Sequence, residues 1–232
     1  MTTYRFAPSP PAAVPIVGTG ALYPIHRIFC VGRNYAAHVA EMGGTAGHEP
    51  PFYFTKSATT YARSGSSVPY PPATGNYHHE IELVVAVGAP AFELSPARAL
   101  DCVFGYACGL DMTRRDLQLA AREQRRPWDL GKDFENATVL SPIEPAERIG
   151  HPSRGTIELR VNGTVRQNSD LERMIHSVPG LIADLSRFYH LQAGDLIFTG
   201  TPEGVGPVQP GDKLEGSIAG VGTIELGIDA RA

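Results

Sequence analysis

The sequence predicts a mixed α/β fold that is rich in β-strands and has only short helices. Glycine and proline are frequent, with 25 and 20 among 232 residues, and both favour turns over long helices. Short apolar segments with β-branched residues outnumber segments with helical periodicity. The hydrophobic content of 42% is sufficient for a core, and the length suits one large domain or two small ones.

The segments that predict strands are spread along the chain. They are short, apolar or β-branched, and bounded by glycine, proline or polar residues. The dipeptide Asn162-Gly163 suits a type I′ turn, so the two strands beside it should form a hairpin. The expected strands cover residues 28–32, 50–56, 77–88, 103–110, 156–161, 164–167, 195–199, 213–219 and 222–228.

Three segments have the residue spacing of helices. The first covers residues 34–42, the second starts near residue 113, and the third covers residues 177–190. Each has residues typical of a helix start or end. These are Asn34 as N-cap and the pair Gly43 and Gly44 at the end of the first, Thr113 and Asp116 as a capping box of the second, and Pro179 with core-facing Leu181, Leu185 and Phe188 in the third.

Residues 1–24 are rich in proline and alanine and show no helical or strand period, so we expect an extended arm or an ordered leader ahead of a single domain of residues 25–232. The formal charge of −4 gives no reason to expect nucleic acid or an anionic membrane as partner. No apolar run reaches the roughly 18–20 residues of a membrane span, and the N-terminus lacks a secretory pattern. The cysteines Cys30, Cys102 and Cys108 fit buried, reduced thiols, which favours a cytoplasmic location.

Glu80 and Glu82 lie in the expected strand 77–88, two residues apart and therefore on the same face. Two carboxylates at the mouth of an apolar strand repel each other and lose hydration. A hard divalent cation with oxygen ligands would offset this cost. A cationic side chain could do the same, and a solvated strand tip would also carry two glutamates. The spacing alone leaves these alternatives open.

His38 and Glu41 are three residues apart and hence neighbours on a helix surface. They could form a base with its orienting carboxylate, although an ordinary exposed polar pair is the commoner outcome of this spacing. Asp111 follows an apolar strand, or belongs to the start of the next helix. On that helix, Arg115 and Gln118 would face whatever Asp111 binds.

Several catalytic motifs are absent from the sequence. There is no G-x-S-x-G elbow of a serine hydrolase, no H-E-x-x-H, and no cysteine cluster for zinc. The glycine-rich loop 200–206 lacks the Gly-Lys-Ser/Thr ending of a phosphate cradle and is followed by Pro207 and Pro210. What remains is a set of carboxylates and a His–Glu pair.

These residues belong to four motifs that resemble the fumarylacetoacetate hydrolase family in order and spacing, from about residue 26 to 228. Two further segments, residues 53–58 and 127–133, are similar to family members that act on fumarylpyruvate. The four motifs are Ile28–Tyr35 with His38, His79–Leu83, Gly109–Asp116 and Leu196–Pro202.

The resemblance implies a β-roll fold with short peripheral helices, a homodimer, and an active site that holds Mg²⁺ or Mn²⁺. It assigns the metal ligands to Glu80, Glu82 and Asp111. His38 and Glu41 would activate a water molecule, and Lys132 would assist catalysis. The residues that it places against the substrate are Arg33, Arg115, Gln118 and Thr201.

The resemblance also implies an activity: hydrolysis of the carbon–carbon bond of a 2,4-diketo acid (an acylpyruvate). The expected substrate is a small dicarboxylic keto acid, fumarylpyruvate, cleaved to fumarate and pyruvate in gentisate-type aromatic catabolism. Decarboxylation of oxaloacetate or keto–enol isomerisation could use the same metal site. A non-enzymatic ligand-binding module is a further alternative, which His38, Glu41 and Lys132 disfavour.

The far carboxylate of such a substrate requires a cation that the sequence does not identify. Arg122, Arg125 and Arg126 lie close together, while Lys56 and Arg63 come earlier in the chain. The arginine cluster could equally be a solvated helix face.

Overall fold

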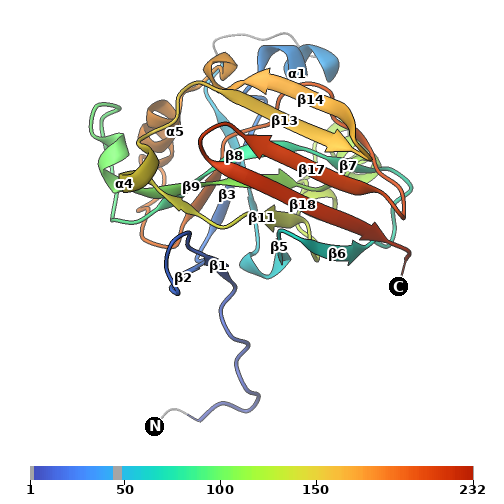
Figure 1. Cartoon of the computed structure of the whole chain (residues 1–232), viewed down its shortest axis with the longest axis horizontal. Coiled ribbons are helices and arrows are strands. Elements are labelled where there is room, and N and C mark those ends of the chain that lie inside the picture. The colour runs from blue at the N-terminus through green and yellow to red at the C-terminus, as the bar shows by residue number, and fades with distance from the viewer. Residues whose placement is uncertain (1–2, 44–48, 232) are drawn as a thin grey trace.

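The computed structural model describes residues 3–43 and 49–231. It is strand-rich, with curled sheets and short helices at their edges (Figure 1), so the expected mixed α/β, β-rich fold is confirmed. Within the described ranges, no helix is long and apolar enough to cross a membrane. The α-helices are α1 (Ala36–Glu41), α2 (Arg115–Glu123), α3 (Asp129–Lys132), α4 (Ala146–Ile149) and α5 (Val178–Leu185).

The central sheet has the strand order β4-β3-β15-β8-β9-β11-β5, with β12 paired to β9. Its middle pair, β8 and β9, runs antiparallel, with Ile81 opposite Leu110 and Glu82 opposite Gly109. Strand β8 is buried along its whole length, as expected from its β-branched and apolar residues. The strands are β3 (Ile28–Gly32), β4 (Phe52–Lys56), β5 (Tyr61–Arg63), β8 (Ile81–Val87), β9 (Val103–Asp111), β11 (Thr138–Leu140), β12 (Glu144–Pro145) and β15 (Leu196–Phe198).

A second sheet, in the order β14-β13-β17-β18-β6, lies over β8 and β9 (Figure 1). Side chains of both sheets share one hydrophobic core. The approach is close at Gly216, where an added Cβ would lie 2.6 Å from Cδ1 of Ile81. The strands are β6 (Ser66–Pro69), β13 (Thr156–Val161), β14 (Thr164–Asp170), β17 (Lys213–Ile218) and β18 (Gly222–Asp229). The smaller sheet β10-β7-β16 joins β7 (Tyr77–His79), β10 (Thr113–Arg114) and β16 (Gly206–Pro207).

The hairpin expected at Asn162-Gly163 is confirmed. Strands β13 and β14 pair across this turn. Asn162 has φ 51° and Gly163 has φ 75°, the two positive values that a type I′ turn requires. The three cysteines are buried and free, as expected.

Residues 13–24 of the expected arm or leader are ordered and contain strands, although their sequence shows no strand period. They form the hairpin of β1 (Ala13–Pro15) and β2 (Leu22–Pro24). Val14 is buried in a second apolar cluster, and the Tyr23 hydroxyl donates to the carbonyl of Val87 at 2.7 Å. Strands of three residues are too short to show a period, so only packing against the body reveals them. Residues ahead of the hairpin extend away from the body (Figure 1).

Two expected helix caps are wrong because tertiary partners take the capping groups. The N-cap of α1 is Tyr35, whereas the Asn34 side chain donates to the carbonyls of His176 and Thr199. The pair Gly43 and Gly44 was expected to end this helix, and Gly44 lies outside the described residues.

The capping box expected for α2 is also replaced. The Thr113 hydroxyl donates to the carbonyl of Asp111 at 3.0 Å. Asp116 instead accepts from the Thr74 hydroxyl at 2.6 Å and from the Gly75 amide at 2.9 Å. These bonds tie the turn before β7 to the start of α2.

Two further expectations need correction. The third helix, α5, ends at Leu185, and Phe188 is 64% exposed instead of facing the core. The expected strand 77–88 is divided, because β7 ends at His79 and β8 begins at Ile81, with Glu80 between them. This break lies at the carboxylate cluster described next.

Candidate metal and substrate site

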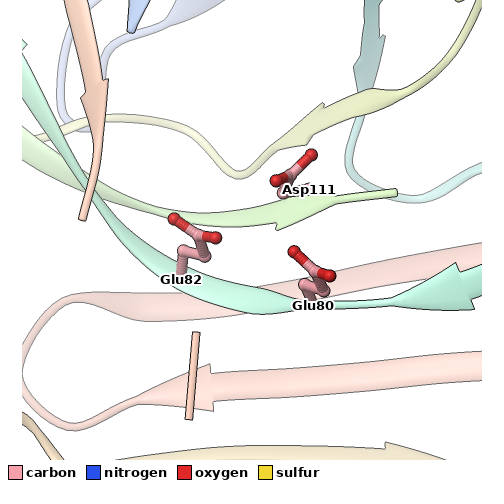
Figure 2. Close-up of side chains that lie close together, drawn as sticks. All are labelled: Glu80, Glu82 and Asp111. Carbon is pink, nitrogen blue, oxygen red and sulfur yellow. The ribbon is translucent and has the colours of Figure 1, made fainter. Parts of the chain in front are cut away.

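Three buried carboxylates meet at the ends of β8 and β9. Glu80 precedes β8, Glu82 is its second residue, and Asp111 ends β9 (Figure 2). The Asp111 amide donates to the Glu80 carbonyl at 2.9 Å, which brings the two residues together. One oxygen of each carboxylate lies within 4.8 Å of the others, and each residue is at most 5% exposed. Asp111 therefore ends a strand and is not part of the helix start.

Three buried cations surround two of these carboxylates. Lys132 Nζ lies 2.8 Å from Glu80 Oε2 and 2.5 Å from Asp111 Oδ2. Lys56 Nζ lies 2.7 Å from Asp111 Oδ1, and the Arg115 guanidinium pairs with Glu80. Of the alternatives left open for the strand glutamates, a cationic side chain is present at Glu80, and cationic side chains compensate Asp111 as well.

Glu82 is the one carboxylate of the three that forms no such ion pair among the described residues. No cation among the described residues lies within ion-pair distance of it, and its only hydrogen bond there is from the Gly200 amide to Oε2 at 2.6 Å. Burial and the charges of Asp111 and Glu80 raise the pKa of Glu82 well above its ordinary value. Burial also acts to raise the pKa of Glu80, but Lys132 and Arg115 outweigh it and lower that pKa. A hard divalent cation fits this donor set of three carboxylate oxygens.

His38 and Glu41 form a pair at the same cavity. His38 Nδ1 lies 3.0 Å from Glu41 Oε2, and the Gly204 amide donates to Glu41 Oε1 at 3.1 Å. His38 is only 7% exposed, whereas the Glu41 side chain is 33% exposed, so the imidazole is the buried member of this pair. Because Nδ1 faces Glu41, Nε2 is the nitrogen that can take a proton.

Every site residue expected from the sequence except Glu41 lines one cavity. Glu41 lies behind His38. Phe52, Phe54 and Trp128 add an aromatic wall. The three aromatic rings pack on one another, with centroids of Phe52 and Phe54 at 5.3 and 5.8 Å from that of Trp128. One wall is therefore charged and the other apolar, as in many small-molecule sites.

The residues expected to bind substrate differ in which of their hydrogen-bonding groups are already used within the protein. The Arg115 guanidinium donates to Gln118 Oε1 at 2.5 Å and also pairs with Glu80. The Thr201 hydroxyl donates to the Ile81 carbonyl at 2.7 Å and accepts from Gln167 Nε2 at 2.8 Å. The hydroxyl hydrogen is thus used, and the main-chain N–H is what Thr201 offers a carboxylate.

Gln167 is an organising residue that sequence reasoning missed. Its side chain is fully buried, accepts from the Ile81 amide at 3.1 Å, bonds His79 Nδ1 at 3.0 Å and donates to Thr201. It therefore joins β14, β8 and the loop at Thr201 beneath the carboxylates. A lone glutamine in a polar hairpin strand carries no sequence signal for this role.

The five cationic side chains that were considered for the far carboxylate of the substrate lie in different parts of the structure. Lys56 is buried beneath Asp111 and donates to the carbonyls of Met112 and Ala137 at 3.2 and 2.7 Å. Arg63 and Arg125 are exposed and are not among the residues that line the cavity. Arg126 lines a separate depression with Trp128 and Asp129. Arg122 lines the cavity itself.

The fold and this site define a member of an established hydrolase family. Residues 27–228 match the model of the fumarylacetoacetate (FAA) hydrolase C-terminal family, so the chain belongs to that family and the resemblance found in the sequence is confirmed.

Particular relatives are similar over most of the chain. A fumarylpyruvate hydrolase from Ralstonia sp is 53% identical over 178 residues, which are 77% of this chain and 92% of the relative. An oxaloacetate tautomerase from Escherichia coli strain K12 is 41% identical over 198 residues, 84% of this chain and 90% of the relative. The crystal structure of fumarylpyruvate hydrolase from Pseudomonas aeruginosa in complex with Mn²⁺ and pyruvate has a TM-score of 0.96 and 45% identity, covering 99% of this chain and 100% of that one.

Proposed function

We propose that this chain is a metal-dependent hydrolase that cleaves the carbon–carbon bond of an acylpyruvate, with fumarylpyruvate as its substrate and fumarate and pyruvate as products. The observation that carries the proposal is the buried carboxylate triad in one cavity with the His38–Glu41 pair. Two findings support the choice of substrate: the 53% identity to a fumarylpyruvate hydrolase, and the near-identical fold of a second one that binds Mn²⁺ and pyruvate.

Glu80, Glu82 and Asp111 are the proposed ligands of Mg²⁺ or Mn²⁺. A bound divalent cation would act as a Lewis acid on the keto acid end of the substrate. The charge balance supports a dianionic substrate. Lys56, Lys132 and Arg115 equal the three carboxylates in number, although none of them pairs with Glu82. A bound divalent ion therefore gives the whole cluster a net charge of about +2. A substrate with two carboxylates would neutralise it.

The side chains account for the proton transfers. His38 Nε2 would remove a proton from a water molecule that attacks the carbonyl of the fumaryl group. Glu41 holds Nδ1 and stabilises the imidazolium that forms, as in other base–orienter pairs. The Lys132 ammonium and the Gln118 amide, both at the cavity wall, would donate to the oxyanion that develops on that carbonyl. The carbon–carbon bond then breaks, and the electron pair leaves with the pyruvate fragment, which is protonated.

Oxaloacetate tautomerisation is the second candidate function, favoured by the 41% identity to a tautomerase over 84% of the chain. Decarboxylation of oxaloacetate would use the same ligands. All three reactions pass through the enolate of a 2-keto acid, so the metal ligands do not distinguish them. Hydrolysis alone needs an attacking water, which the buried imidazole of His38, paired with Glu41, is placed to activate.

A substrate panel with and without Mg²⁺ or Mn²⁺ tests the proposal. We expect metal-dependent loss of the ultraviolet absorbance of fumarylpyruvate, with release of fumarate and pyruvate in equal amounts. Efficient turnover of oxaloacetate without cleavage of fumarylpyruvate would refute it. Full activity after chelation would refute the metal assignment, and unchanged turnover in His38→Ala would refute the base.

The cellular setting is part of the same proposal. We propose a cytoplasmic homodimer that acts in gentisate-type aromatic catabolism, on the basis of the bacterial relatives and the family membership. The division into an N-terminal segment of residues 1–24 and a catalytic domain of residues 25–232 is proposed likewise. Sedimentation as a monomer at micromolar concentration would contradict the dimer.

A further inference from the structure

The cavity has two guanidinium groups, Arg33 and Arg122, that pair with no carboxylate among the described residues. Arg115 and Lys132, the other long cations of the wall, are bound to Glu80 and Asp111. Arg33 lies with its guanidinium carbon 5.8 Å from the centre of the Phe52 ring. Arg122 has one hydrogen bond to a neutral group, from Nη1 to the Met42 carbonyl at 3.3 Å. A guanidinium has five N–H donors, and most of those on Arg122 have no partner among residues 3–43 and 49–231.

Helix α2 places Arg122 in line with the residues at the carboxylate cluster. Arg115, Gln118 and Arg122 are spaced by three and four residues, so they share one face of α2, and all three line the cavity. Arg115 marks the end of this row at the metal site, since it pairs with Glu80. Arg122 lies seven residues further along, about 10 Å at a rise of roughly 1.5 Å per residue.

This separation matches the length of the proposed substrate. The carboxyl carbons of fumarylpyruvate are joined by six carbon–carbon bonds, which span roughly 7–8 Å in a zigzag chain at about 1.5 Å per bond. With the keto acid end at Glu80, Glu82 and Asp111, the far carboxylate would come within reach of an arginine at the other end of the row. Oxaloacetate has only three such bonds between its carboxyl carbons and would stop about halfway.

We infer that Arg122 binds the far carboxylate of the substrate and thereby selects long dicarboxylic acylpyruvates over acylpyruvates that lack this group. The inference rests on the proposed function and adds a specificity residue to it. A guanidinium binds a carboxylate with two parallel hydrogen bonds. Phe52, Phe54 and Trp128 form the apolar wall of the same cavity, which suits the carbon chain between the two carboxylates.

Arg122→Met tests the inference, compared on two substrates. Fumarylpyruvate has the far carboxylate, and acetylpyruvate has the same diketo acid without it. We expect the ratio of kcat/KM for fumarylpyruvate to that for acetylpyruvate to fall about 10- to 100-fold, mostly through KM, because a hydrogen-bonded charge pair is lost. Arg125→Met is the matched control: Arg125 is exposed two residues after the end of α2 and does not line the cavity, so the ratio should stay as in the wild type.

The two substrates separate recognition from a merely structural role. Arg122 also contacts the end of α1, which carries His38. If Arg122→Met only displaced α1, both substrates would lose activity equally and the ratio would not change, which would overturn the inference. A fall of the ratio in Arg33→Met but not in Arg122→Met would overturn it as well. If the wild type cleaved acetylpyruvate but not fumarylpyruvate, the substrate would be wrong while the hydrolase function stood.

Discussion

Glu82→Gln separates the metal role of this residue from a structural one. At 4.8 Å, the upper bound for the oxygen distances in the triad, two unit charges repel by about 3.5 kcal/mol at an effective dielectric constant of 20. Glu82 faces two such charges without a cationic partner of its own among the described residues. Gln is the same size and can still accept from the Gly200 amide. The metal-free variant should therefore be as stable as the wild type or more stable.

In the presence of Mn²⁺, the wild type should instead be more stable than Glu82→Gln. A ligand at about 100 times its Kd stabilises the native state by about 2.7 kcal/mol, which raises the Tm by roughly 5–11 °C for a chain of this size. Glu82→Gln replaces one of three anionic ligands, so the increase should nearly vanish at the same Mn²⁺ concentration. The assay is thermal unfolding with chelator and with added Mn²⁺. The exposed Glu225→Gln serves as the matched control and should respond like the wild type.

Two results would refute this reasoning. A wild-type increase of Tm in Glu82→Gln would show that Glu82 is not a ligand. A large loss of stability in the metal-free variant would show that its carboxylate is compensated within the protein.

Three further predictions concern the groups around the triad. Lys56→Met should lower the free energy of unfolding by about 3–5 kcal/mol, because it leaves Asp111 with one cation fewer in a buried site. Urea titration measures this change, and the exposed Arg63→Met is the control that should change little. Equal effects of the two substitutions would contradict the prediction. Glu41→Gln should reduce kcat by at most the roughly 10²–10⁴-fold of a general base and leave the circular dichroism spectrum unchanged; wild-type kcat would remove Glu41 from the mechanism. Asp116→Asn should destabilise the protein by about 1–2 kcal/mol at pH 7, because burial is outweighed by bonds from Thr74 and Gly75 that lower the Asp116 pKa below 3.8. A lowered pKa contributes stability that is fully present above the unfolded pKa and is lost as the pH falls through the folded pKa. The stabilities of the two proteins should therefore begin to converge below about pH 4, and a constant difference would show that the charge is not involved.

The local pattern of the sequence was enough for much of the fold and for the members of the site. Apolar segments and turn residues located most of the longer strands, including the hairpin at Asn162-Gly163, but not short strands such as β5, β6 and β11. The spacing of Glu80 and Glu82 put two carboxylates together, and the family motifs added Asp111 and the His38–Glu41 pair. Such features depend on residues that are close in sequence, where backbone geometry fixes which side chains are neighbours.

Several groups could be placed only by contacts between distant segments. The Asn34 amide could cap α1, but bonds to His176 and Thr199 claim it. Lys56 was one candidate among five for a substrate carboxylate until its ammonium was found beneath Asp111. Gln167 had no signal at all, although its side chain links three segments at the site.

The sequence by itself thus determined which chemical groups this protein brings to its site: three carboxylates and a His–Glu pair. The tertiary structure decided which cation pairs with which carboxylate. Lys56 and Lys132 pair with Asp111, whereas Arg122 lines the cavity wall. The physical reason is that an ion pair depends on a separation of a few ångströms between charges. Residues that lie tens of positions apart reach that separation only when the sheets and α2 have packed.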